Sequence, residues 1–121
     1  MSANSTEKIH EFVQLFNRAE FFKSHELLEN LWRETKGKER VFLQGLIQAA
    51  VALHHDKNKN EKGALEEFRL AKEKLKQFPP LFLGINAKKF LEDLKRYFLI
   101  SKKERKDQPL PMIRLSFLYR E

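Results

Sequence analysis

The chain has 121 residues, no cysteine, 41% hydrophobic residues and a formal net charge of +7. This length suits a single domain with its own core, and the lack of cysteine excludes a disulfide framework and a thiolate metal site. No run approaches the ~18 consecutive apolar residues of a membrane helix, and the first residues lack the charged and apolar regions of a signal peptide. We therefore expect a soluble, cytoplasmic protein with no membrane partner.

The excess of basic residues lies entirely in the second part of the chain. Residues 1–55 carry seven Lys or Arg and seven Asp or Glu, whereas residues 56–121 carry seventeen and ten. Such asymmetry can mark a surface that meets nucleic acid or an acidic partner, although lysine-rich helix faces are commonly only solvated. No nucleic-acid-binding motif is present, so specific nucleic-acid binding is not predicted. Two interpretations of the basic residues stay open: they keep the protein soluble, or they bind polyanions weakly and in a salt-sensitive way.

Two helices are predicted first, over residues 6–19 and 20–36. Each has apolar residues that recur at helical spacing on one face. In the first helix these are Ile9, Phe12, Val13 and Phe16; in the second they are Phe21, Leu28 and Trp32. Ser5 or Thr6 is the expected N-cap of the first helix, since a short hydroxyl side chain can accept from the free amides of the first turn.

A central helix is predicted from about Lys38 to Lys57, because residues 42–55 are the most apolar stretch of the chain. A helix that is apolar nearly all round is a buried one. Small residues form one stripe along it, which predicts the close approach of another backbone: Gly45, Ala49 and Ala52. A narrow polar row, within about 40° on a helical projection, consists of Gln44, Gln48 and His55.

A fourth helix follows a short turn at 58–60, with Asn60 as its expected N-cap. So short a connection makes the two helices antiparallel neighbours. Apolar and small residues keep helical rhythm along it: Ala64, Phe68, Ala71, Leu75 and Phe78. This pattern resembles the second helix of a tetratricopeptide unit. No second copy appears, so we predict one tetratricopeptide-like hairpin within a closed bundle.

Two prolines, at 79 and 80, end the fourth helix because neither has an amide hydrogen to donate. Residues 81–85 form a short apolar linker, and Asn86 is the expected cap of a fifth helix. A charged loop is predicted over 101–108 and an extended segment over 109–117 that crosses the bundle or a partner. The predicted fold is an all-α, single-domain bundle of about five helices over 1–121, with an extended C-terminal tail from about 102 to 121.

One constellation could carry chemistry. His25 and Glu29 share a surface of the second helix, and the row of Gln44, Gln48 and His55 could pack against it. Three interpretations stay open. The cluster is a structural polar network, a divalent metal site such as zinc held by His25, Glu29 and His55, or a pocket for a small polar ligand recognised by Trp32 and Gln48.

These residues also carry a family resemblance. The pattern Phe21-Phe22-x-x-His25-Glu26-x-x-Glu29-x-x-Trp32, then Phe42-Leu43-Gln44-Gly45-Leu46-Ile47-Gln48-x-Ala50, then His55 and Asn60-x-x-Gly63-Ala64 resembles the domain of unknown function 309 family over about residues 12–78. The resemblance implies a small all-helical bundle with no established activity. It implies these motif positions: His25, Glu26, Glu29, Trp32, Gln44, Gly45, Gln48, His55, Asn60 and Gly63. The chain departs from the pattern at Lys59, where glycine usually precedes the asparagine, and at Lys23, where an acid is common.

Taken together, the sequence predicts a non-enzymatic interaction or scaffold module without a cofactor, which binds an unidentified protein partner or itself. The candidate ligand site comprises His25, Glu26, Glu29, Trp32, Gln44, Gln48 and His55. The alternative is a hydrolase-like enzyme that depends on a metal or small ligand and uses His25, Glu29 and His55.

Overall fold

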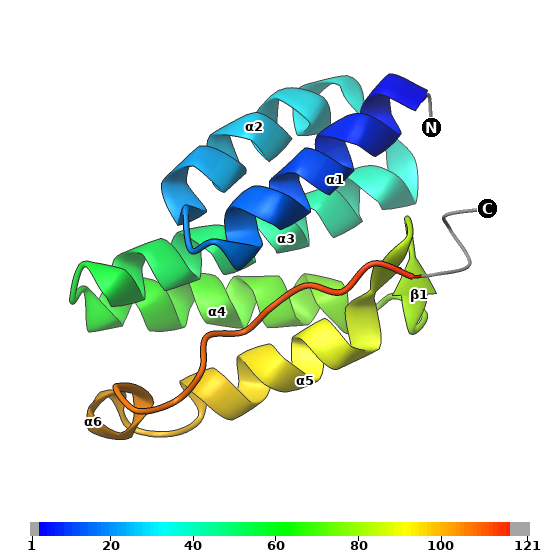
Figure 1. The fold of residues 1–121 in the computed structure, drawn as a ribbon. Coiled ribbons are helices and arrows are strands. Elements are labelled where there is room, and N and C mark those ends of the chain that lie inside the picture. The colour runs from blue at the N-terminus through cyan, green and yellow to red at the C-terminus, as the bar shows by residue number, and fades with distance from the viewer. Residues whose placement is uncertain (1–2, 117–121) are drawn as a thin grey trace.

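The computed structural model describes residues 3–116, which contain six helices and one small β-hairpin. The helices are α1 (Ala3–Asn17), α2 (Phe21–Glu34), α3 (Gly37–Lys57), α4 (Glu61–Leu75), α5 (Ala87–Phe98) and α6 (Lys102–Arg105); the strands are β1 (Leu81–Phe82) and β2 (Ile85–Asn86). In Figure 1, α3 lies in the middle, with α1 and α2 on one side and α4 and α5 on the other. The predicted all-α bundle is confirmed. None of the helices within 3–116 combines the length and hydrophobicity that a bilayer crossing needs.

The small-residue stripe of α3 is buried, and its Gly45 faces α4. Ala49 and Ala52 are fully buried. A Cβ atom on Gly45 would lie 3.0 Å from Leu75 Cδ2 and 3.2 Å from Lys74 Cβ. Gly45 near the start of α3 therefore meets the end of α4, so the two helices form the expected antiparallel hairpin with closely spaced backbones.

The predicted caps are partly right. The side chains of Asn60 and Asn86 accept from the backbone amides of Gly63 (3.0 Å) and Lys89 (3.1 Å), which confirms both as N-caps. The expected cap of the first helix is wrong, because α1 already begins at Ala3 and residues 5 and 6 lie within its first turn. Local signals fix a cap only where nothing upstream continues the helix.

Two segments are more ordered than the sequence suggested. Residues 81–86 form a tight hairpin whose two turn residues, Leu83 and Gly84, both have positive φ (50° and 77°), as a type I′ turn requires. The predicted loop over 101–108 contains α6 instead. Ser101 caps it in a capping box with Glu104, a Ser-x-x-Glu signal that was present in the sequence.

The C-terminal segment is extended and runs back along the bundle to the β-hairpin (Figure 1). The Asn17 side chain donates to the carbonyl of Ile113 (2.9 Å) and accepts from its amide (2.8 Å), and Ser116 N donates to the Gly84 carbonyl (2.8 Å). Ile113 is buried. Of the two predicted alternatives, this segment crosses its own bundle; the rest of the predicted tail, 117–121, lies outside the described residues.

Candidate functional site

The His25–Glu29 pair exists, but it lies on the surface of α2. His25 Nδ1 donates to the carbonyl of Phe22 (3.0 Å), and its Nε2 lies 3.8 Å from Glu29 Oε2. Glu29 also accepts from Arg33 at 3.0 Å, and its side chain is 39% exposed. The His25 side chain is 19% exposed, so the pair is a partly solvated link within one helix, of the kind that contributes little to stability.

His55 belongs to a different arrangement, at the turn between α3 and α4. An amide NH₂ can only donate, so Asn60 Nδ2 donates to His55 Nδ1 (3.3 Å) while Asn60 Oδ1 caps the amide of Gly63. A Cβ atom on Gly63 would lie 2.7 Å from Asn60 Nδ2 and 3.1 Å from His55 Cδ2. The three motif positions thus form one helix cap, in which glycine leaves room for the asparagine and the imidazole.

The remaining predicted site residues do not form a connected hydrogen-bond network. Gln48 Oε1 and Trp32 Nε1 are buried and have no hydrogen-bond partner among residues 3–116. The guanidinium of Arg40 lies 4.1 Å from the centroid of the Trp32 ring. Gln44 is half-buried and Glu26 is exposed.

The metal site that was one of the three interpretations finds no support in this geometry. Within the described residues, no three His, Cys, Asp or Glu side chains stand close enough to share a metal ion. His25 and Glu29 lie on α2, whereas His55 bonds the cap of α4. The helical projection placed these residues correctly on their helices, but it did not reveal that His55 turns toward α4.

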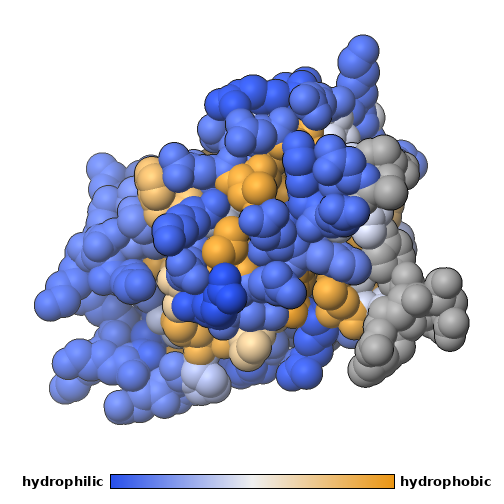
Figure 2. Space-filling view, turned by 45° about the horizontal axis from the view of Figure 1, so that its top comes forward, coloured by the Kyte–Doolittle hydropathy of each residue, from blue (hydrophilic) through white to orange (hydrophobic). Residues whose placement is uncertain are grey.

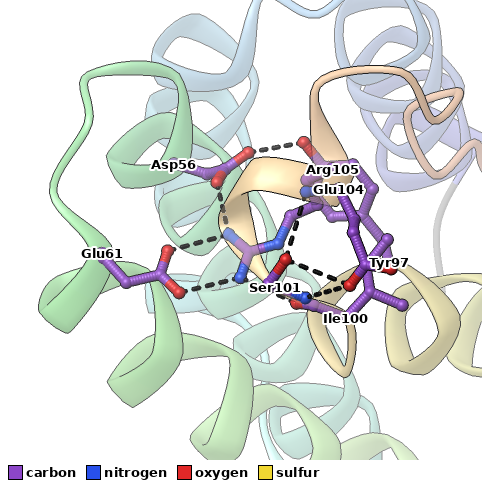
Figure 3. A network of polar contacts seen from close by, with 7 residues as sticks. All are labelled: Asp56, Glu61, Tyr97, Ile100, Ser101, Glu104 and Arg105. Carbon is purple, nitrogen blue, oxygen red and sulfur yellow. Dashed lines mark hydrogen bonds and ion pairs between the residues drawn. The ribbon is translucent and has the colours of Figure 1, made fainter.

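A network that the sequence did not indicate lies at the opposite end of α5 from the β-hairpin (Figures 1 and 3). Arg105 of α6 is only 4% exposed. Its guanidinium donates to Asp56 Oδ1 (2.7 Å), to both carboxylate oxygens of Glu61 (2.8 Å each) and to the carbonyl of Ile100 (3.3 Å). Tyr97 completes the network by donating its hydroxyl to Asp56 Oδ2.

The contacts in this network shift the pKa values of Glu61, Tyr97 and Arg105. The hydrogen bond from Arg105 lowers the pKa of Glu61. Burial, followed by the hydrogen bond to Asp56, raises the pKa of the Tyr97 hydroxyl. The bond to Glu61 in turn raises the pKa of Arg105. The two terminal nitrogens of the guanidinium thus share two carboxylates and a carbonyl, while the buried Arg105 Nε has no partner among residues 3–116.

This network forms one wall of a pocket of about 560 Å³. Five lysines line the pocket: Lys57, Lys59, Lys102, Lys103 and Lys106. None of the five forms an ion pair with a residue in 3–116, where the paired lysines are Lys23, Lys76 and Lys89. Arg105 offsets one of the two carboxylate charges, so the five lysines, Arg105 and two carboxylates give the pocket a net formal charge of +4. Sequence reasoning missed this site because its lysines come from the end of α3, the following turn and α6.

Lys59 has an unusual backbone conformation. Its φ is +62°, in the left-handed region where glycine is favoured and other residues are strained. The amide of Lys59 donates to the carbonyl of Asp56 and that of Asn60 to the carbonyl of His55, the two bonds of a Schellman helix end. The glycine that the family resemblance implies at this position suits the turn better, and the chain places a pocket lysine there instead.

Comparisons with known proteins agree with the resemblance in the sequence. The model of the family described as Domain of unknown function (DUF309) matches residues 9–66. An uncharacterized protein of Aquifex aeolicus (strain VF5) is 32% identical over 85 residues, and the uncharacterized protein YpuF of Bacillus subtilis (strain 168) is 40% identical over 53. The matches cover 69% and 43% of this chain but only 26% and 30% of those proteins. The chain therefore spans less than a third of the length of these relatives.

A solved structure shares the fold. The crystal structure of the conserved hypothetical protein TTHA0068 from Thermus thermophilus superposes with a TM-score of 0.68 at 28% identity, and the match covers 75% of this chain and 95% of that one. The names of these proteins give no activity, and α5 and α6 lie beyond the residues that the family model matches. Over residues 9–66, just under half of its length, this chain is similar to the DUF309 family.

Proposed function

We propose that the protein is a non-enzymatic binding module and that its ligand is a phosphate-bearing anion held in the lysine-rimmed pocket. The observation that carries this proposal is the charge of the pocket. Its only two carboxylates bind Arg105, while five lysines around them have no ionic partner among the described residues. An anion that enters the pocket meets cations without displacing an existing ion pair.

The size of the electrostatic attraction favours a bound anion over lysines that are only solvated. One phosphate about 4 Å from one ammonium gains about 1 kcal/mol in bulk water and about 4 kcal/mol at an effective dielectric constant of 20. Several lysines around one concave site add to this attraction, because its low-dielectric walls focus the field. Lysine contacts to phosphate release counterions, so the affinity is expected to fall steeply with salt.

The other partners expected from the sequence find less support. A protein partner or a second copy of the chain usually needs a contiguous apolar patch. On the face in Figure 2, apolar side chains reach the surface in small separate patches among hydrophilic residues. Among the described residues, the large exposed apolar side chains are spread over five parts of the chain: Phe22, Leu65, Leu81, Leu99, and Leu110 with Met112.

Titration calorimetry with inorganic tripolyphosphate tests the proposal. A variant with Lys102→Gln, Lys103→Gln and Lys106→Gln removes three pocket charges; the matched control, Lys36→Gln, Lys38→Gln and Lys88→Gln, removes three exposed charges outside the pocket. We expect the pocket variant to lose at least about tenfold in affinity and the control much less, with wild-type binding weakening between about 20 and 300 mM NaCl. Equal losses in the two variants would refute the pocket as the site.

A further inference from the structure

A second, smaller pocket adjoins the lysine-rimmed pocket. It measures about 300 Å³ and is lined by the α1–α2 turn, the start of α2 and the end of α3, including Ala19, Phe22, His54 and Lys57. Lys57 lines both pockets. In Figure 1 the two turns and α6 gather at the same end of the bundle. A ligand that extends from one pocket into the other therefore passes this lysine.

The smaller pocket presents an aromatic side chain that the core does not use. Phe21 is buried at 3% exposure, whereas the adjacent Phe22 is 50% exposed. The Phe22 ring is braced on its own surface by two imidazoles, with ring centroids 5.2 Å away at His25 and 5.4 Å away at His54. An aromatic ring that is held in place yet half exposed is a ready stacking partner for a planar ligand.

An aromatic platform beside a lysine-lined pocket matches the chemistry of single-stranded nucleic acid. Such proteins bind by stacking bases on aromatic rings while a basic groove follows the phosphates. Duplex DNA keeps its bases stacked inside, so it could use the lysines but not the Phe22 ring. Polyphosphate likewise offers charge without a planar group.

We propose that this end of the bundle binds single-stranded nucleic acid without sequence preference. A base stacks on Phe22, and the neighbouring phosphates lie along Lys57 and Lys59 toward α6. This inference rests on the proposed function of the lysine-rimmed pocket, and it adds the class of ligand and the role of Phe22. It is compatible with the absence of a sequence-reading motif, because stacking and charge do not distinguish one base from another.

The test compares ligands with and without bases by fluorescence anisotropy. The probes are a labelled oligothymidylate, an oligouridylate and an abasic phosphodiester chain, each of about 12 units. We expect wild-type protein to bind the base-bearing strands at least about fivefold more tightly than the abasic chain, the effect of one stacked base at ~1 kcal/mol. Phe22→Ala should lose this difference and keep its affinity for tripolyphosphate.

Two control variants test whether the effect of Phe22→Ala is specific to the loss of its aromatic ring. Phe22→Trp retains an aromatic face, so it should bind base-bearing strands at least as well as wild type. Leu65→Ala truncates another exposed apolar side chain, on α4, and should change neither affinity. Because Phe22 is half exposed, its truncation is not expected to unfold the chain, and a thermal melt checks this.

The outcomes separate the two proposals. Equal binding of abasic and base-bearing strands would overturn the stacking inference while tripolyphosphate binding upheld the anion site. A duplex of equal length that binds as tightly as the single strand, with no effect of Phe22→Ala, would also overturn it. So would binding confined to phosphatidylserine vesicles, since a headgroup surface would then be the ligand. Loss of tripolyphosphate binding as well would overturn both proposals.

Discussion

The Nδ2 atom of Asn60 lies 3.3 Å from Nδ1 of His55, so the side chain that caps α4 is itself held by the last turns of α3. The same amide group uses its oxygen on the backbone of Gly63. One asparagine therefore ties both helices of the hairpin to their connecting turn. Three of the positions that the family resemblance singles out have a structural explanation here, without any ligand.

Gly63→Ala is expected to destabilise the protein by about 1 kcal/mol, although alanine is intrinsically the better helix former by a similar amount. The new Cβ would stand 2.7 Å from Asn60 Nδ2 and force the cap to move. Urea unfolding measures the change. In an Asn60→Ala background only the 3.1 Å contact with His55 Cδ2 remains, so there Gly63→Ala should cost clearly less. A loss of equal size in both backgrounds would mean that the cap is not the cause.

Gly45→Leu is expected to destabilise the fold more than Leu46→Ala, which removes a fully buried side chain and should cost about 2–5 kcal/mol. A leucine at position 45 would be driven into Leu75 and Lys74 of α4, where even a Cβ lies at 3.0–3.2 Å. Gly45→Ala should fall between wild type and Gly45→Leu. Thermal melts of the three variants decide the order, and wild-type stability of Gly45→Leu would contradict the close packing of α3 on α4.

The parts of the fold that were predictable depend on short-range patterns. The stripe of Gly45, Ala49 and Ala52 predicted that another helix backbone packs closely against α3. Asn60 and Asn86 predicted the N-caps of α4 and α5. Each of these signals acts within a few residues. The side-chain directions around His55 were not predictable. A residue at the boundary of two helix interfaces turns to one of them according to tertiary packing, which a helical projection does not contain.

The candidate site could not be predicted from the sequence, again because it depends on tertiary packing. Phe22 lies in the first part of the chain and Lys102 in the second, and only the fold brings their pockets together at Lys57. An aromatic residue interleaved with lysines along the sequence would have been noticed. Here the interleaving exists only in space. Arg105 gave no signal either, because a buried arginine looks like any other cation in a basic segment.

Arg105→Met is expected to cost about 3 kcal/mol, since it leaves two partly buried carboxylates without their cation. Arg105→Lys should recover only part of this loss, because an ammonium cannot reproduce the two parallel bonds to Glu61. Urea unfolding at neutral pH gives both values. A lysine variant as stable as wild type would show that charge alone, without the geometry of the guanidinium, holds α6 in place.

The contribution of Glu61 should depend on pH in a defined direction. Its pKa in the folded protein lies below the ordinary value of 4.5 because Arg105 donates to it. A depressed pKa stabilises the folded state at pH values above 4.5 and loses this effect as the pH falls through the folded pKa. The difference in stability between wild type and Glu61→Gln should therefore be largest near neutrality and shrink in acid. A difference independent of pH would contradict the ion pair.

The polar residues of α2 should tolerate substitution. Glu29→Ala is expected to cost less than about 1 kcal/mol, because its partners are an exposed arginine and a histidine at 3.8 Å. Glu29→Gln should be milder still. Neither zinc nor a chelator should shift the melting temperature of wild type, since a metal that bound the folded state would stabilise it. A chelator-induced drop that Glu29→Ala abolishes would restore the metal hypothesis.

Lys59→Gly should raise stability and lower ligand affinity at once. Glycine accepts the φ of +62° at the end of α3 without strain, and the gain should be about 0.5–1 kcal/mol after the greater freedom of glycine in the unfolded chain is subtracted. The same change removes one lysine from the pocket, so tripolyphosphate should bind less tightly. Ala19→Gly is the matched control, because Ala19 lies in the turn after α1 with a φ of +63° and lines only the smaller of the two pockets. It should give a similar gain in urea unfolding with unchanged affinity. If Lys59→Gly gained stability without losing affinity, Lys59 would not contribute to the anion site.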